Sequence, residues 1–479
     1  MKPCLLLSGF IGRVGRKSMS SRVDFTMGFN TRGLASKKAH ANGYRIYVLG
    51  DFSGRRDAEW SQRNIKRIDS DTFEQVMTQI RPTLDLDSGV TLHFESIEDF
   101  HPDAWFNKIR ILADLLELKK ALSNPKTAAQ AAAKIQSFNQ TDPNQNISPQ
   151  TQQVDVETEA DTLQRLLGKA PEPKTDKADT VERLIERVVS PYITKDVSSQ
   201  YQALIDVIEK TVSQFLRTLL QRQDFKSLES LWRATEALVN EEYADEQCFF
   251  LVDISQAELM AAVNEGGSEF KQRLLAHVQL DDEGRDVLLV GDFSFAGSAE
   301  DAELLKFLSA TAKACGGCFL GAAGQSLIDS AILGESKKDG DWTRYLSEIN
   351  ADSVVLAYPR YLLRLPYGFK RDPIETLAFE ECSEVPAQSE LLWGNPALLC
   401  ARALIRMTQE DSADDAVLMS DVPVFSYTLD DEPVLQPGTE TLLIEAQVNA
   451  LLSKGITTLI GFRQRQGVQF PIITTLADR

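Results

Sequence analysis

The chain has 479 residues, of which 43% are hydrophobic and 25% charged, a balance typical of globular domains and not of disordered, collagenous or fibrous chains. Its net charge of −19 argues against nucleic acid as a partner, because non-specific binding neutralises phosphates with Lys and Arg. Residues 1–67 hold fourteen Lys or Arg against four Asp or Glu, a net +10, which leaves −29 for the rest. Such opposite fields guide association between domains or copies, although a solvated basic segment has the same composition.

The cysteine pattern indicates a reducing compartment. Six cysteines are too few and too irregularly spaced for a secreted disulfide framework of this length. No apolar run approaches the roughly 20 residues that span a bilayer, and no small-residue cleavage site follows the short apolar stretch at residues 5–7. We therefore expect a cytoplasmic protein without membrane insertion. Either Met1 or Met19 is the start, which makes residues 1–18 an N-terminal extension.

In the first region, which ends at residue 123, the sequence pattern predicts alternating strands and helices. Strand-like patterns cover residues 22–30, 44–49 and 90–94, and helical spacing covers residues 70–80 and 103–122. The last of these helices opens at Pro102, which suits a first helical turn because the missing N–H would have no partner there.

Composition changes between residues 124 and 180. This segment is rich in Ala and then in Gln, Asn, Thr, Asp and Pro, so it cannot bury enough apolar area to offset its ordering entropy. We predict a flexible linker. Within it, residues 161–167 (DTLQRLL) form one short amphipathic helix that either docks on a partner or stays transient.

The second region, which begins near residue 181, again shows alternating helix and strand patterns. This alternation indicates α/β layers. The predicted helices cover residues 201–220, 225–239, 302–314 and 441–454, and the predicted strands cover residues 248–254, 287–290, 318–322 and 354–356. The sequence GDFS ends an apolar run twice, at residues 50–53 and at residues 291–294. This echo indicates either chance or related units in the two regions.

Few residues have the pattern of a catalytic or metal site. The four histidines show no zinc spacing, and the glycines at positions 9, 12 and 15 lack the phosphate-loop spacing. Asp51 and Asp292 each follow an apolar run and could hold a metal or phosphate in an α/β enzyme. Capping of a turn is the more frequent role for such an Asp.

Two further clusters have structural interpretations. Cys315 and Cys318 have the spacing of a zinc or redox pair, but no second pair supplies further ligands, so we expect buried structural thiols. Glu380, Glu381 and Glu384 form a carboxylate cluster without a second, differently tuned group to face it. We therefore predict no catalytic, cofactor-binding or metal-binding residue, no cofactor, and no enzymatic activity.

With these motifs in view, the chain resembles the contractile sheath proteins of bacterial type VI secretion systems. The first region resembles the small sheath subunit in VLGDFSG (48–54), RNIKRIDSDTFEQVM (63–77) and FESIEDFHPDAW (94–105). The second region resembles the large subunit, and the motifs that carry this resemblance are RQDFKSLESLWRATEALV (222–239), LLVGDFSF (288–295), YPRYLLRLPYG (358–368), FEE (379–381) and LWGNPALLCA (392–401).

The resemblance implies an α/β (mixed α+β) chain of two sheath-like units joined by a flexible linker. The implied domains are an extension at 1–18, a small-subunit-like domain at 19–123, the linker at 124–180 and a large-subunit-like domain at 181–479 with a shortened C-terminal tail. The implied partners are other sheath subunits or the chain itself, together with the inner tube, the baseplate and an AAA+ unfoldase.

The implied function is structural: the chain packs into a contractile sheath or a sheath-like assembly. The shortened tail leaves a second reading, a non-polymerising adaptor or cap on a sheath end or baseplate. The third reading is an α/β enzyme that uses Asp51 or Asp292. The resemblance also implies that residues 23–29 (VDFTMGF) form an edge strand exchanged with a neighbouring copy, and backbone pairing to an open sheet edge links chains strongly. The alternative is an ordinary internal strand or a disordered arm.

Overall fold

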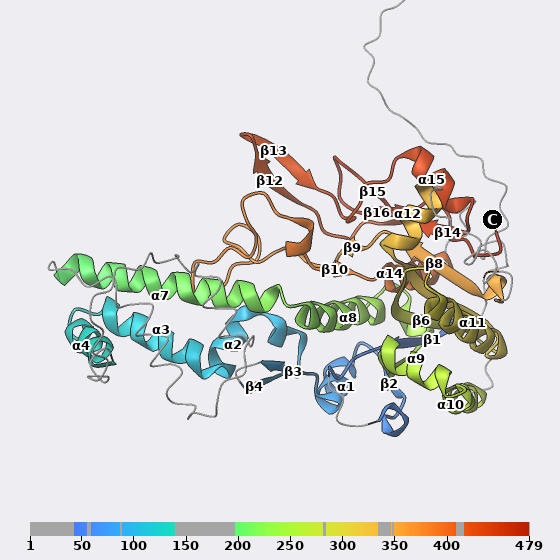
Figure 1. Ribbon diagram of the computed structural model, residues 1–479, viewed down its shortest axis with the longest axis horizontal. Coiled ribbons are helices and arrows are strands. Elements are labelled where there is room, and N and C mark those ends of the chain that lie inside the picture. The colour runs from blue at the N-terminus through green and yellow to red at the C-terminus, as the bar shows by residue number, and fades with distance from the viewer. Residues whose placement is uncertain are drawn as a thin grey trace, which may run out of the picture.

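The computed structural model describes residues 43–54, 59–86, 89–138, 197–280, 284–333, 346, 349–408 and 416–478. Its centre is a seven-stranded sheet in the order β14-β8-β7-β6-β1-β5-β2 (Figure 1). Every neighbouring pair in it is parallel except β2 with β5. The strands are β1 (Tyr44–Gly50), β2 (Lys66–Ile68), β5 (Cys248–Asp253), β6 (Asp286–Phe295), β7 (Gly317–Ala323), β8 (Val354–Tyr358) and β14 (Ile456–Thr458).

Strand β1 comes from the first region but lies between two strands of the second. It pairs with β5 on one side and with β6 on the other, so that Val48 lies opposite Leu251 and Val290. A strand that is covered on both faces is mostly apolar. This agrees with the sequence YRIYVLG, which is buried from Arg45 to Gly50. We call the β5-β1-β6 contact the seam; it makes the two regions one body.

Helices cover both faces of this sheet. One face, with Ile46 and Val48, packs against α8 (Gln223–Val239) and α14 (Pro396–Met407). The other face, with Tyr47 and Leu49, carries the apolar side chains of the remaining covering helices. These are α9 (Gln256–Asn264), α10 (Ser268–Gln279), α11 (Ala299–Ala314), α12 (Gln325–Leu333) and α15 (Glu445–Leu452).

The rest of the first region extends away from the sheet along a long helix. Its elements are α1 (Phe73–Ile80), the hairpin of β3 (Thr83–Leu86) and β4 (Val90–His93), α2 (Pro102–Lys108), α3 (Arg110–Ser123) and α4 (Ala128–Phe138). Helix α3 packs against α7 (Val197–Leu220) and against α4. We call α3, α4 and α7 the arm, which projects from the body in Figure 1.

Short strands complete the second region above the sheet (Figure 1). β9 (Tyr361–Leu362) pairs with β10 (Trp393–Gly394), and β16 (Val468–Phe470) lies between β11 (Val417–Met419) and β15 (Ile460–Gly461). β12 (Phe425–Leu429) and β13 (Glu432–Gln436) form a separate hairpin.

The α/β class predicted from the sequence is confirmed, and two details differ from the prediction. The helix expected at residues 103–122 is two helices, because Ile109 has an extended backbone between α2 and α3. Part of the range predicted as linker is helical, since α4 occupies Ala128–Phe138 and buries Ala128, Ala131 and Ala132. The predicted strand at residues 22–30 and the helix at residues 161–167 lie outside the described residues.

Candidate functional site

The two aspartates predicted as alternatives for chemistry lie side by side. Asp51 directly follows β1, Asp292 lies in β6, and the adjacent strands bring Gly50 next to Asp292. A third carboxylate, Asp253, ends β5 on the opposite side of β1. The seam therefore gathers three carboxylates near the carboxyl ends of its strands, where open α/β sheets bind ligands.

Burial changes the proton affinity of these groups. Burial raises the pKa of Asp292 to about 6, with Asp51 adding to this and a hydrogen bond from Asn395 opposing it. Burial also raises the pKa of Asp51, and the nearby Asp253 carboxylate raises it further. Burial likewise raises the pKa of Asp253, although Arg63 opposes the effect.

The hydrogen bonds of two of these carboxylates are those of turn-capping residues. Asp51 accepts a bond from the Gly54 N–H at 3.0 Å, and Asp253 accepts one from the Ser53 N–H at 3.1 Å. Asp253 thus fixes the turn that follows β1 from across the seam. Within the described residues, no three His, Cys, Asp or Glu side chains are grouped as a metal ion would require.

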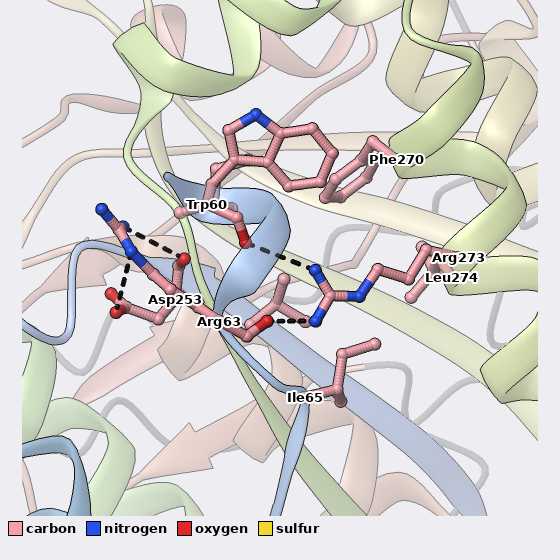
Figure 2. A pocket seen from close by; sticks show the side chains of 9 residues that line it. Trp60, Arg63, Ile65, Asp253, Phe270, Arg273 and Leu274 are labelled. Atoms are coloured by element: carbon pink, nitrogen blue, oxygen red, sulfur yellow. Dashed lines mark hydrogen bonds and ion pairs between the residues drawn. The ribbon is translucent and has the colours of Figure 1, made fainter. Parts of the chain in front are cut away.

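A small cavity lies beside this cluster and is also shared by both regions (Figure 2). Trp60 and Arg63 line it from the first region, and Asp253, Phe270 and Arg273 from the second. Arg63 forms an ion pair with Glu258 at 2.8 Å, and Arg273 donates to the carbonyls of Ser61 and Arg63. The cavity volume of about 20 Å³ suits one ordered water and excludes an organic substrate.

Cys315 and Cys318 are buried free thiols that pack on opposite faces of the sheet. Cys318 belongs to the core on the α8 and α14 side, whereas Cys315 belongs to the core beneath α11. Burial raises the pKa of the Cys315 thiol to about 11, which keeps it protonated and unreactive. The two thiols therefore do not face each other, although their spacing in the sequence is that of a zinc or redox pair.

The glutamate cluster separates into a buried residue and two exposed ones. Glu381 is buried and accepts bonds from Arg364 and from the Tyr367 N–H, each at 2.7 Å. Glu380 and Glu384 are exposed, and Glu380 accepts a bond from the Phe369 N–H. Glu381 thus holds a loop, and the expected cluster does not face a cleft.

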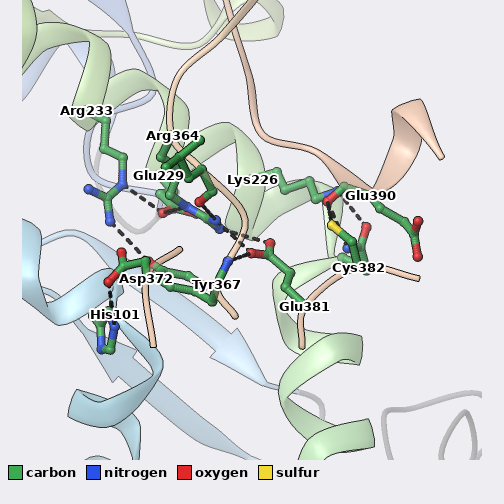
Figure 3. A network of polar contacts seen from close by, with 12 residues as sticks. His101, Lys226, Glu229, Arg233, Arg364, Tyr367, Asp372, Glu381, Cys382 and Glu390 are labelled. Carbon is green, nitrogen blue, oxygen red and sulfur yellow. Dashed lines mark hydrogen bonds and ion pairs between the residues drawn. The ribbon is translucent and has the colours of Figure 1, made fainter. Parts of the chain in front are cut away.

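Glu381 belongs to a buried network that connects α8 to the 364–381 loop (Figure 3). Arg364 lies between Glu381 and the fully buried Glu229 of α8, with its Nε 2.7 Å from the Glu229 carboxylate. Arg233 pairs with the same carboxylate at 2.8 Å. Although burial alone would raise the pKa of Glu229, Arg364 and Arg233 hold it below its ordinary value.

Aromatic contacts join the first region to α8. Trp232 donates its indole N–H to the Phe52 carbonyl at 3.0 Å and meets the rings of Phe52 and Phe73 edge-on. Phe225 similarly contacts the ring of Trp105. The apolar side chains that this helix turns toward the core include Leu228, Leu231, Trp232 and Leu238, all of them buried.

A polar contact joins α2 to the same loop that carries Glu381. The Asp103 carboxylate accepts bonds from the N–H groups of Glu375 and Thr376 and from the Thr376 hydroxyl, the last at 2.7 Å. The first and second regions therefore share a sheet, an aromatic core and a polar contact. This is the interface expected of two parts that fold together.

Sequence reasoning missed Asp253, Arg63 and Arg364. Asp253 had the same signal as Asp51, an acidic residue at the end of an apolar run. Arg364 had no such signal, because only the folded loop places it between Glu229 and Glu381. The first GDFS covers the end of β1 and the turn after it, whereas the second lies within the neighbouring β6. Phe52 and Phe293 belong to the cores on opposite faces of the sheet.

A sheet shared by both regions defines an α/β protein built from two interlocking parts. Comparison with protein families assigns each of the two regions to a family model. Residues 202–475 match the VipB family model, described as EvpB, tail sheath N-terminal domain, and residues 15–141 match the VipA model of the type VI secretion system. The chain therefore belongs to the type VI secretion tail sheath family, and the predicted union of small-subunit-like and large-subunit-like parts is confirmed.

One curated relative agrees with this assignment. The chain is 28% identical over 256 residues to the type VI secretion system sheath protein TssC1 of Pseudomonas aeruginosa. The match covers 48% of this chain and 51% of the relative, so the chain spans about half the length of that protein. In the part of the chain that the structure describes, no helix combines the length and apolarity needed to cross a membrane.

Proposed function

We propose that this chain is a structural subunit of a type VI secretion contractile sheath or a sheath-like assembly, and that it acts by packing rather than by catalysis. The observation that carries this proposal is the seam, in which the VipA-like region supplies the strand between β5 and β6 of the VipB-like region. Its first partners are further copies of the chain or separate sheath subunits. The inner tube, baseplate and AAA+ unfoldase follow from the sheath family, as does a place in the bacterial cytoplasm.

Electron microscopy of the purified chain, alone and mixed with separate sheath subunits, tests this function. A sheath subunit gives tubes or rings of regular spacing. The alternative, an adaptor or cap, gives particles only at sheath ends. A chain that stays monomeric and joins no sheath in either sample contradicts both.

We further propose that the domains are an extension at 1–18, a small-subunit-like domain at 19–123, a linker at 124–180 and a large-subunit-like domain at 181–479. The seam requires the two larger domains to remain together after the chain is cut. Cleavage at a protease site placed within residues 139–153 leaves the two fragments in one peak on gel filtration. Separate folded fragments would contradict this division into one body.

The edge strand at residues 23–29 supplies the proposed link between copies. Its basic surroundings, with Arg22 before it and Arg32, Lys37 and Lys38 after it, meet the acidic body of a neighbour. Deletion of residues 19–30 abolishes higher-order assembly, while the melting temperature of the body stays unchanged to within a few degrees. Assembly that survives the deletion rules out strand exchange.

A further inference from the structure

The hairpin of β12 and β13 carries an apolar stripe that the described chain covers at one end only. Phe425, Tyr427 and Leu429 occupy alternate positions of β12 and therefore share one face. Phe425 is buried against the small core of Leu362 and Trp393, Tyr427 is half-buried, and Leu429 is 40% exposed. The stripe thus runs outward from the core to the tip of a hairpin that projects from the body (Figure 1).

The tip of this hairpin is a tight, acidic turn. Asp430 and Asp431 have φ values of 51° and 64°, which is the two-residue turn that matches the twist of a hairpin. Glu432 follows and pairs with Leu429 across the strands. In the described chain, none of these three carboxylates forms an ion pair.

The base of the stripe carries two cations, Lys370 and Arg371, next to the carboxylates of Asp372 and Glu380, and it also carries an exposed aromatic residue. Arg371 lies over the Phe425 ring at 4.5 Å. The turn before it holds Phe369, which is 80% exposed, and the exposed Lys370.

Three hydrogen bonds fix this turn. Arg371 N–H donates to the Gly368 carbonyl, Gly368 N–H to the Asp372 carbonyl, and Phe369 N–H to Glu380. These bonds hold the turn in the geometry that exposes the Phe369 side chain to solvent.

The two ends of the stripe are complementary to each other but do not meet within one copy. Five residues of extended chain separate Phe425 from Asp430, which is about 16 Å at roughly 3.3 Å per residue. A second copy can place its acidic tip on the basic turn, so that Leu429 of one copy contacts Phe369 of the next. Each copy then still offers its own tip, and a head-to-tail contact of this kind continues into an open row.

We infer that the hairpin tip, Leu429–Glu432, docks onto the Phe369–Arg371 turn of a second copy of this chain. This inference rests on the proposed function, because it supplies one lateral contact of the assembly. Apolar contact between Leu429 and Phe369 gives the attachment, and the opposite charges select its direction. The contact is distinct from the seam, which lies within one copy.

Charge reversal in the full chain tests the contact. Lys370→Glu and Glu432→Lys are both exposed changes that leave the turn geometry intact. Each alone places like charges together and raises the concentration for half-assembly by about tenfold in sedimentation velocity. The double variant restores assembly, and an equimolar mixture of the two single variants co-assembles because each supplies what the other lacks. Lys454→Glu, at an exposed position in the turn that follows α15, is the matched control and assembles as the unaltered chain does.

The outcomes separate this contact from the proposed function. If the unaltered chain assembles and the single variants assemble equally well, the hairpin contact is wrong and the sheath proposal stands. If the single variants fail but neither the double variant nor the mixture recovers, the pairing of Lys370 with Glu432 is wrong. An unaltered chain that stays monomeric overturns the hairpin contact, whereas the sheath proposal fails only if the chain also joins no separate sheath subunits.

Discussion

The seam and the arm both join the first region to the second, but they do so by different physics. In the seam, β1 is hydrogen-bonded on both edges and covered on both faces. In the arm, α3 meets α7 along one helical face, and an ion pair between Lys119 and Glu209 lies at its partly exposed margin. The seam is therefore required for the fold of both regions, whereas the partly exposed margin of the arm can be altered at low cost.

A charge in the centre of the seam has the largest expected effect. Val48→Asp buries a carboxylate without a partner, which costs several kcal/mol against a total stability of about 5–15 kcal/mol. Both regions should lose their fold together, as measured by circular dichroism and limited proteolysis. Val385→Asp, at a half-exposed valine, is the control and keeps the fold. A native second region in the Val48→Asp chain would show that the slot between β5 and β6 closes without β1.

Removal of Arg364 has the next largest effect. Arg364→Met leaves the buried Glu381 without its arginine and leaves Glu229 paired with Arg233, and loss of one partner from such a network costs about 3–5 kcal/mol. The urea midpoint should fall accordingly. The double variant Arg364→Met, Glu381→Gln should recover a large part of the loss, because it removes the unpaired carboxylate and keeps the pair of Glu229 with Arg233. An equal loss in the double variant would mean that packing, not charge, sets the cost.

The carboxylate cluster makes the seam sensitive to pH in a defined direction. Because the pKa of Asp292 rises from 3.8 to about 6 on folding, the folded state holds this proton more tightly than the unfolded chain. The resulting stabilisation is complete below about pH 4 and is lost as the pH rises through about 6. Asp292→Asn should therefore match the unaltered chain near pH 4 and exceed it by at most about 3 kcal/mol at pH 7. A constant difference between the two unfolding free energies from pH 4 to 7 would contradict the raised pKa.

The comparison of seam and arm also shows what the sequence could reveal. The apolar run at residues 44–49 predicted a buried strand, and the periodicity at residues 225–239 predicted the helix that covers it. The position of β1 between β5 and β6 was not predictable from either run, because parallel pairing joins segments about 200 residues apart and leaves no local pattern. The same holds for Arg364, whose role depends on two carboxylates from distant segments. Asp430 and Asp431 lacked the glycine that usually marks a hairpin turn, so β12 and β13 were not expected.

The smallest effect is expected at the margin of the arm. Lys119 lies 2.8 Å from Glu209, but the two side chains are 23% and 36% exposed, and such pairs contribute less than about 1 kcal/mol. Lys119→Ala should therefore lower the stability by no more than this amount, and the difference should vanish at high salt because screening removes the attraction. Lys120→Ala, at the exposed neighbouring position, controls for the loss of a positive charge from α3. A loss of several kcal/mol for Lys119→Ala alone would mean that the arm is as tightly coupled to the fold as the seam, and the distinction between the two contacts would fail.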